Sequence, residues 1–214
     1  MSELRVSEIY PSVQGESTLA GWPCVFVRLT GCPLRCVWCD TAYAFSGGET
    51  LPIDEIVRRA LEHGLPMVEV TGGEPLAQRA APLLLAQLAD RFATVLLETS
   101  GAYPIAGLDP RVRVILDLKA PGSGEERRNK YENLAALKPG DELKIVIADR
   151  GDYDWARATL RERPIPDFVP LHISPVHGKL HPREVVAWLL ADRWQAHLQL
   201  QQHKYIWPPE TRGV

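Results

Sequence analysis

The 214-residue sequence has few cysteines, no excess of basic residues and no long hydrophobic run. Four cysteines in an aliphatic-rich chain argue against a disulfide framework, which suits small secreted domains that bury little core. With 24 Lys and Arg against 27 Asp and Glu, the net charge of -3 leaves no basic footprint for nucleic acid. Because no apolar stretch approaches the length of a membrane span, we expect neither a nucleic-acid partner nor a membrane.

The N-terminal residues Met1-Ser2-Glu3 lack the basic and apolar regions of a secretory signal. We therefore expect a cytoplasmic protein, in which thiols stay reduced and available as ligands. The composition, 45% hydrophobic and 24% charged, is that of an ordinary globular chain without low-complexity segments. The length predicts one domain over residues 1–214.

Three of the four cysteines, Cys32, Cys36 and Cys39, lie in one loop of residues 31–41, spaced C-x3-C-x2-C after an apolar run. Closely spaced thiolates suit an iron–sulfur cluster, zinc or Cu(I). A 4Fe–4S cluster would keep one iron without a protein ligand, open to a small molecule. Structural zinc needs a fourth ligand, and Cys24, inside the apolar run, is better explained as a small buried hydrophobe. The spacing favours an iron–sulfur cluster.

Strand and helix patterns alternate along the rest of the chain. Strands are expected at residues 4–10, 24–30, 67–71, 94–98, 112–117, 143–148, 169–174 and 196–201, helices at 54–63, 79–90, 153–162 and 182–192, and an irregular or helical segment at 125–137. This alternation favours parallel βαβ units. About six core strands are too few for a closed eight-stranded barrel, so we predict an α/β fold, a partial, open parallel β/α barrel. The polar motifs follow strand ends, where such folds carry their active sites.

The cysteine loop resembles the signature of radical S-adenosylmethionine enzymes. Further motifs extend the likeness to the 7-carboxy-7-deazaguanine synthase family: residues 12–16, 26–32, 38–41, 71–75, 98–101, 117–119 and 203–204. The resemblance implies a radical rearrangement that removes hydrogen from C6 of 6-carboxy-5,6,7,8-tetrahydropterin, contracts its ring and releases ammonia to give 7-carboxy-7-deazaguanine for queuosine and 7-deazapurine synthesis. It also implies a flavodoxin- or ferredoxin-type electron donor and a homodimer.

The resemblance assigns residues to three groups. A 4Fe–4S cluster would be held by Cys32, Cys36 and Cys39, and Mg²⁺ by Thr41. S-adenosylmethionine would contact Trp38, Cys39, Asp40, Gly73, Ser100, Asp117, Leu118 and Lys119. The pterin would contact Val13 through its main chain, Gln14, Gly15, Arg28, Thr71, Glu98 and His203.

The residues themselves leave several points open. Arg28 lies in an apolar strand and needs an anion, either a substrate carboxylate or an internal partner, Glu16 or Glu98. Glu98 either accepts hydrogen bonds from the amino-pyrimidinone edge of a pterin or forms a structural ion pair. The tail of residues 203–214 either brings Val214 to the pocket or packs across a subunit interface. A glycyl-radical activase and a non-catalytic, zinc-stabilised binding module are the alternative functions.

Overall fold

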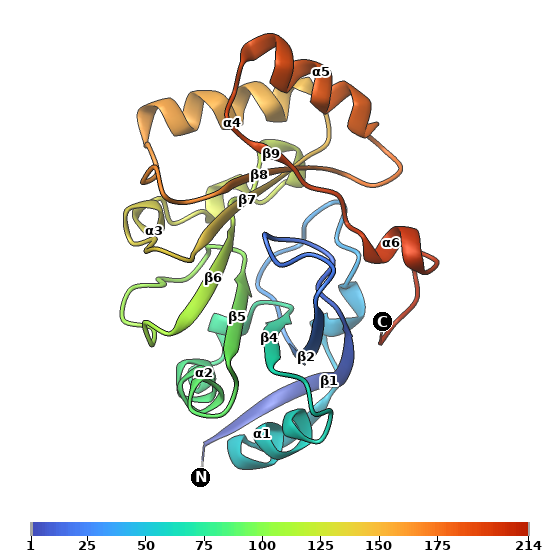
Figure 1. Cartoon of the computed structure of the whole chain (residues 1–214), viewed down its shortest axis with the longest axis vertical. Helices are drawn as coiled ribbons and strands as arrows, with labels where there is room; N and C mark the ends of the chain where they lie inside the picture. Colours follow the sequence, from blue (N-terminus) through green and yellow to red (C-terminus); the bar gives the residue numbers. More distant parts are fainter. Residues whose placement is uncertain (1, 214) are drawn as a thin grey trace.

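A computed structural model describes residues 2–213 as one curved nine-stranded sheet with helices packed on its outer side (Figure 1). The strands lie in the order β3-β1-β2-β4-β5-β6-β7-β8-β9. The strands are β1 (Glu3–Val13), β2 (Pro23–Leu29), β3 (Glu49–Pro52), β4 (Met67–Gly72), β5 (Thr94–Thr99), β6 (Val112–Asp117), β7 (Glu142–Ile147), β8 (Leu171–Pro175) and β9 (His197–Leu198). The α-helices are α1 (Ile53–Leu61), α2 (Ala81–Ala89), α3 (Glu132–Ala135), α4 (Arg150–Glu162), α5 (Pro182–Asp192) and α6 (His203–Ile206).

The sheet is parallel from β2 to β9 and antiparallel at its other end, where β1 pairs with β2 and with β3. Within the described residues β3 and β9 end the order without pairing to each other, so the barrel is open. The predicted partial barrel is confirmed. Its core of six parallel strands, β2 and β4 to β8, is extended by the two-residue β9 at one end and by the antiparallel β1 and β3 at the other.

The two faces of the sheet have different chemistry because successive side chains of a strand point to opposite sides. The outward residues of β4, Val68 and Val70, join a large apolar core with α1, α2 and the other helices. At the start of β2 and β4, the inward residues are Cys24, Phe26 and Met67. They belong to a smaller apolar cluster that closes the bottom of the barrel and is called the barrel floor here. Charged side chains lie above this floor, so the interior of the barrel is polar.

Several boundaries differ from the sequence-based expectations. β1 continues to Val13, and β3 was not predicted. Helix α4 begins at Arg150 rather than at residue 153, because the Asp149 side chain caps it by accepting from the Asp152 N–H at 3.1 Å. The strand expected at residues 196–201 is limited to β9. The segment 125–137 is two short helical turns, Glu126–Arg128 and α3, as expected.

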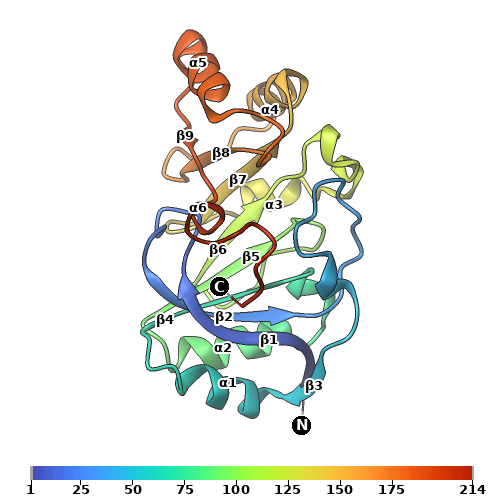
Figure 2. The same cartoon turned by 90° about the vertical axis from the view of Figure 1, so that its right-hand side faces the viewer.

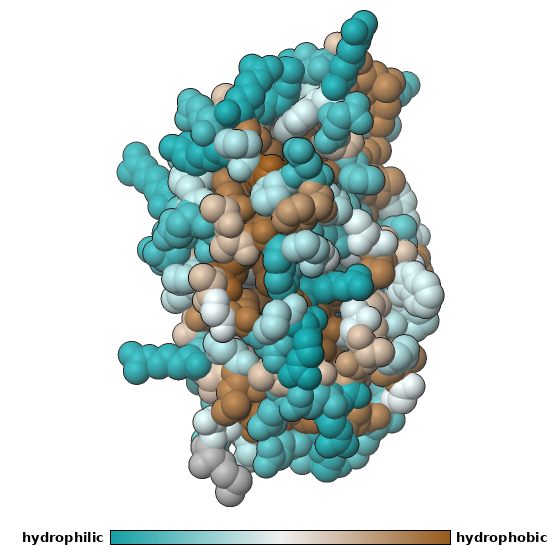
Figure 3. Space-filling model, turned by 60° about the vertical axis from the view of Figure 1, so that its left-hand side comes forward, coloured by the Kyte–Doolittle hydropathy of each residue, from teal (hydrophilic) through white to brown (hydrophobic). Residues whose placement is uncertain are grey.

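The connection between β6 and β7 contains no long helix on the outer side, only short turns and α3. Figure 3 shows the face on that side, where hydrophobic side chains form a band between hydrophilic ones. On the opposite side, α6 and the chain end lie beside the hairpin of β1 and β2 (Figures 1 and 2). Within residues 2–213 no helix is long and apolar enough to span a bilayer.

Candidate active site

A cavity of about 820 Å³ opens at the carboxyl ends of the parallel strands. All but one of the residues predicted for the site line it: Val13, Gln14, Gly15, Arg28, Cys32, Cys36, Trp38, Cys39, Asp40, Thr41, Thr71, Gly73, Glu98, Ser100, Asp117, Lys119 and His203. The exception is Leu118, whose side chain is buried in the outer core. Leu118 directly follows β6, between Asp117 and Lys119, which line the cavity, and its own side chain points to the opposite side. Its N–H donates to the Lys144 carbonyl at 2.9 Å.

The cysteine loop is held in place by backbone contacts at both ends. The Gly31 N–H donates to the Ala44 carbonyl at 2.7 Å, and the Val37 N–H donates to the Ser123 carbonyl at 3.0 Å. The Arg35 guanidinium donates to the Cys32 carbonyl at 2.8 Å and stacks on Phe45. These contacts give the loop a defined path, so the three thiols are brought to one cavity before any ligand binds.

In the described part of the chain, the thiols lack the convergent ligand set of a structural zinc site. Cys32 and Cys36 are half-buried and Cys39 is exposed, and none is in a disulfide. Among residues 2–213, no three His, Cys, Asp or Glu side chains converge on a point that one ion could occupy. A structural zinc site instead gathers its ligands within about 2.3 Å of one ion. Cys24 is fully buried five residues before the end of β2, roughly 16 Å along the strand from that end.

Gly73 lets the loop after β4 pack directly against the start of the cysteine loop. A Cβ at this position would lie 2.1 Å from the Gly31 carbonyl oxygen and 3.1 Å from Cys32 Cβ. Only glycine therefore fits this close approach of two loops. Nearby, Asp117 Oδ1 is buried without a hydrogen-bond partner among the described residues, while Oδ2 binds Lys119 Nζ at 2.8 Å. An unpaired buried oxygen in the lining of the cavity fits a polar cofactor such as S-adenosylmethionine.

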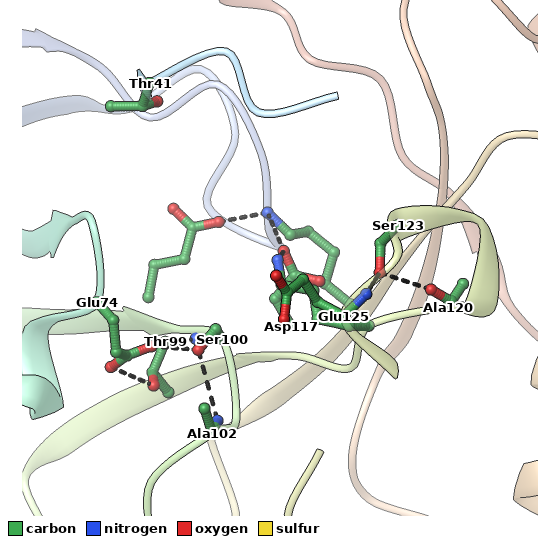
Figure 4. Close-up of polar contacts among 12 residues, drawn as sticks. Thr41, Glu74, Thr99, Ser100, Ala102, Asp117, Ala120, Ser123 and Glu125 are labelled. Atoms are coloured by element: carbon green, nitrogen blue, oxygen red, sulfur yellow. Dashed lines mark hydrogen bonds and ion pairs between the residues drawn. The ribbon is translucent and has the colours of Figure 1, made fainter. Parts of the chain in front are cut away.

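Glu74 of the Gly-Gly-Glu-Pro run is fully buried and organises the neighbouring strand end. Its carboxylate accepts from the Leu76 N–H and the Thr99 hydroxyl, both at 2.8 Å, and from the N–H and hydroxyl of Ser100 at 2.7 and 2.5 Å. Figure 4 shows this carboxylate directed at Thr99 and Ser100. Glu74 thus holds two cavity-lining loops together.

Buried Lys144 is the centre of the charge network above the barrel floor. Its Nζ contacts Glu16 Oε2 at 2.6 Å and Glu98 Oε1, and lies 3.7 Å from Asp117 Oδ2. Burial alone would lower the pKa of Lys144, but the surrounding carboxylates raise it well above its usual value. Burial alone would likewise raise the pKa of Glu98, but Lys144 outweighs it and lowers that pKa. Both groups are therefore charged at neutral pH.

Arg28 has an internal partner that the sequence did not indicate. Its Nε donates to Glu8 Oε1 at 2.7 Å and its Nη2 to the Tyr10 hydroxyl at 2.7 Å. The expected internal partners, Glu16 and Glu98, are wrong because both bind Lys144. Glu8 lies opposite Arg28 in the β1–β2 register, after an irregularity between Val6 and Glu8. The third guanidinium nitrogen, Nη1, has no partner among residues 2–213.

The C-terminal segment covers one side of the same cavity. Gln202 donates its N–H to the Gly15 carbonyl at 2.9 Å, and Lys204 Nζ contacts Asp40 Oδ2 at 2.6 Å. Pro209 to Gly213 line the cavity, with the Arg212 guanidinium 4.2 Å from the centre of the Tyr43 ring. The described part of the tail therefore packs on its own chain, at the rim of the cavity. Val214 lies outside the described residues.

Sequence reasoning missed two charged residues that line the cavity, Glu69 and Lys144. Glu69 is an isolated charge in the otherwise apolar strand Met67–Gly72, whereas Lys144 shares the strand Glu142–Ile147 with a second charged residue, Glu142. Arg28 shows the same pattern as Glu69, so the argument that an isolated charge in an apolar strand needs a partner applies to Glu69 as well. The cavity-lining residues of the tail carry no comparable signal.

Comparisons with known proteins agree with this site. The radical SAM superfamily model matches residues 26–121, which contain the cysteine loop and the Gly-Gly-Glu-Pro run. The chain is 49% identical to the 7-carboxy-7-deazaguanine synthase of Chlorobaculum tepidum over 99% of its length and 97% of the relative. It is 43% identical to the synthase of Koribacter versatilis, covering 99% of this chain and 100% of the relative.

The fold and the cysteine site thus define a radical S-adenosylmethionine enzyme. The structure of QueE from Escherichia coli has the same fold, with a TM-score of 0.77 and 21% identity over 94% of this chain and 95% of that one. The sequence relatives decide the narrower question: the chain belongs to the 7-carboxy-7-deazaguanine synthase family. Family membership therefore favours the synthase over the two alternative functions, a glycyl-radical activase and a zinc-stabilised binding module.

Proposed function

We propose that this chain converts 6-carboxy-5,6,7,8-tetrahydropterin to 7-carboxy-7-deazaguanine with loss of ammonia. The observation that carries the proposal is that one cavity brings the three cysteines together with Arg28 and ionised Glu98. The substrate requires both kinds of group, because it has a carboxylate at one end of its bicyclic ring and hydrogen-bond donors at the other.

The substrate groups are matched by side chains that the fold holds rigidly. The Nη1 of Arg28 is available to a carboxylate while Glu8 and Tyr10 fix the rest of the guanidinium. Glu98, anchored by Lys144 and by the Thr71 hydroxyl at 3.2 Å, accepts hydrogen bonds from the amino-pyrimidinone edge. His203, which packs against Gly15, covers the ring from the side of the tail. These contacts orient the substrate and exclude water.

The cofactor side of the cavity would be formed by the cysteine loop and the strand ends beside it. Cys32, Cys36 and Cys39 would hold a 4Fe–4S cluster, and Gly73 and Asp117 would contact S-adenosylmethionine. When bound, these groups supply the radical chemistry, and the protein supplies binding and orientation. Trp38, Asp40, Ser100 and Lys119 line the same part of the cavity.

Mg²⁺ would bind at Thr41, whose hydroxyl donates to Asp40 Oδ1 at 2.9 Å. Magnesium prefers six oxygens and retains water, so one threonine oxygen cannot hold it alone. The substrate carboxylate and water would complete the site. Calorimetric titration of Mg²⁺ should therefore show tight binding only with substrate present; saturation of the substrate-free protein would contradict this.

Three further assignments complete the proposal. A flavodoxin- or ferredoxin-type donor would deliver the electron where the cysteine loop reaches the surface, at Val37, which is 74% exposed. A second copy would form a homodimer, for which the exposed Val186 and Leu190 of α5 offer apolar surface. The reduced thiols favour the cytoplasm. Light scattering tests the dimer, since a monomer at all concentrations would contradict it.

The test of the reaction is an anaerobic turnover assay. Reconstituted protein is mixed with dithionite, S-adenosylmethionine, Mg²⁺ and 6-carboxytetrahydropterin, and the products are identified by mass spectrometry. Carboxydeazaguanine should form with the wild-type protein and not with Cys36→Ala. Deoxyadenosine without carboxydeazaguanine would keep the radical chemistry and overturn the substrate.

A further inference from the structure

Glu69 is a buried carboxyl group that the proposed reaction has not used. It lies on the inward face of β4, is 2% exposed and lines the floor of the cavity. Among residues 2–213 no cation lies within salt-bridge distance of it. The carboxylates of the Lys144 network differ in this respect, since Glu16 and Glu98 both contact Lys144.

The hydrogen bonding around Glu69 involves only one of its oxygens. Gln14 Nε2 donates to Glu69 Oε2, while the Oε1 of Gln14 accepts from the Glu16 N–H at 2.9 Å. The Gln14 amide is thereby fixed at both ends, with its nitrogen turned to Glu69. No described residue contacts Oε1 of Glu69 by a hydrogen bond. This oxygen is therefore free to carry a proton, on a residue that lines the cavity.

An ionised Glu69 would be an uncompensated charge in a buried site, which is costly. Burial raises the pKa of Glu69 well above its usual value, and the nearby charges of Glu98 and Glu16 raise it further, against opposing effects of Lys144 and Arg28. The titratable and charged groups around it are Tyr10 on β1, Glu16 after β1, Cys24 and Arg28 on β2, Glu98 on β5 and Lys144 on β7. Neither cation contacts Glu69 directly.

We propose that Glu69 is a neutral carboxylic acid that donates a hydrogen bond to an acceptor on the ring of the bound substrate. This inference rests on the proposed function. Glu98, on the neighbouring strand, is ionised and only accepts, so the two carboxyl groups offer one donor and one acceptor. An amino-pyrimidinone edge presents N–H donors beside a carbonyl acceptor, and this pair is complementary to it. A ring without that acceptor would leave the Glu69 donor unpaired, which makes Glu69 a specificity-determining residue.

The test compares Glu69→Gln, which keeps a neutral donor, with Glu69→Leu, which has none. Substrate binding is measured by anaerobic calorimetry on reconstituted enzyme with S-adenosylmethionine, after circular dichroism and iron content have confirmed folding. Glu69→Gln should bind within about threefold of wild type, and Glu69→Leu about ten- to a hundredfold more weakly. Glu142→Gln, a matched change at a buried carboxylate outside the cavity, should bind like wild type.

The infrared spectrum of wild-type protein minus that of Glu69→Gln gives an independent measure of the proton on Glu69. At pH 8 the wild-type protein should show the carbonyl band of a protonated carboxylic acid, and Glu69→Gln should lack it. The proposal is overturned if the band is absent, or if Glu69→Gln loses as much affinity as Glu69→Leu, because either result means an ionised Glu69. Failure of the proposed function is a different outcome, in which wild-type enzyme forms no carboxydeazaguanine.

Discussion

Glu74→Gln should destabilise the protein strongly although it changes one atom. Each carboxylate oxygen accepts from one backbone N–H, of Leu76 or Ser100, and from one hydroxyl. Whichever oxygen becomes the amide NH₂, a partly buried backbone N–H loses its acceptor, at a cost of about 1–3 kcal/mol. A hydroxyl can rotate to accept, but an N–H cannot. The remaining hydrogen bonds lose charge assistance, about 1 kcal/mol each.

The expected loss in free energy of unfolding is therefore about 3–5 kcal/mol, a large part of the usual total for a domain. This loss can be measured by urea unfolding of reduced, cluster-free protein, monitored by circular dichroism. Without the cluster, metal binding does not contribute to the measured stability. Glu62→Gln is the control, because Glu62 is 59% exposed and solvent screens its ion pair with Arg58, which should contribute little to stability. A loss below about 1 kcal/mol for Glu74→Gln would refute the account of this carboxylate.

Three other predictions concern the cavity and the fourth cysteine. Gly15→Ala should raise the KM for the pterin about tenfold or more, because its Cβ would lie 2.3 Å from His203 Nδ1; an unchanged KM would show that His203 does not position substrate. Burial lowers the pKa of His203 below 6.5 in the folded protein. As the pH falls, His203 is therefore protonated in the unfolded chain before it is protonated in the folded one. The free energy of unfolding should fall as the pH drops through about 6.5, and His203→Gln should lose this part of the dependence in urea titrations at pH 5 to 7.5. Cys24→Ala should keep wild-type iron and sulfide content after reconstitution, since Cys24 is buried in the barrel floor; loss of cluster would make it a ligand.

The fold could be predicted because its signals are local and repeat along the chain. Apolar strands alternate with amphipathic helices such as α1, whose buried residues are Ile53, Ile56, Val57 and Ala60. The prediction was least accurate for the two strands at the edges of the sheet. β9 has two residues and β3 four, and such short strands form through pairing with a neighbour rather than through a pattern of their own.

The candidate site was predicted where a motif is contiguous and missed where it depends on register. The cysteine loop and the Gly-Gly-Glu-Pro run could be found directly. The Arg28–Glu8 pair could not, because it depends on an irregular antiparallel register between β1 and β2. The three carboxylates around Lys144 come from the loop after β1, from β5 and from β6, so only the folded barrel brings them together.

The most direct test of the account is an anaerobic crystal structure of the reconstituted protein with S-adenosylmethionine and 6-carboxytetrahydropterin. The account predicts a cluster on Cys32, Cys36 and Cys39, and the pterin in the same cavity with its carboxylate at Arg28 and its amino-pyrimidinone edge at Glu98. A pterin bound elsewhere, for example in the smaller pocket beside His181 and Tyr205, or held in the cavity without contact to Arg28 and Glu98, would contradict it.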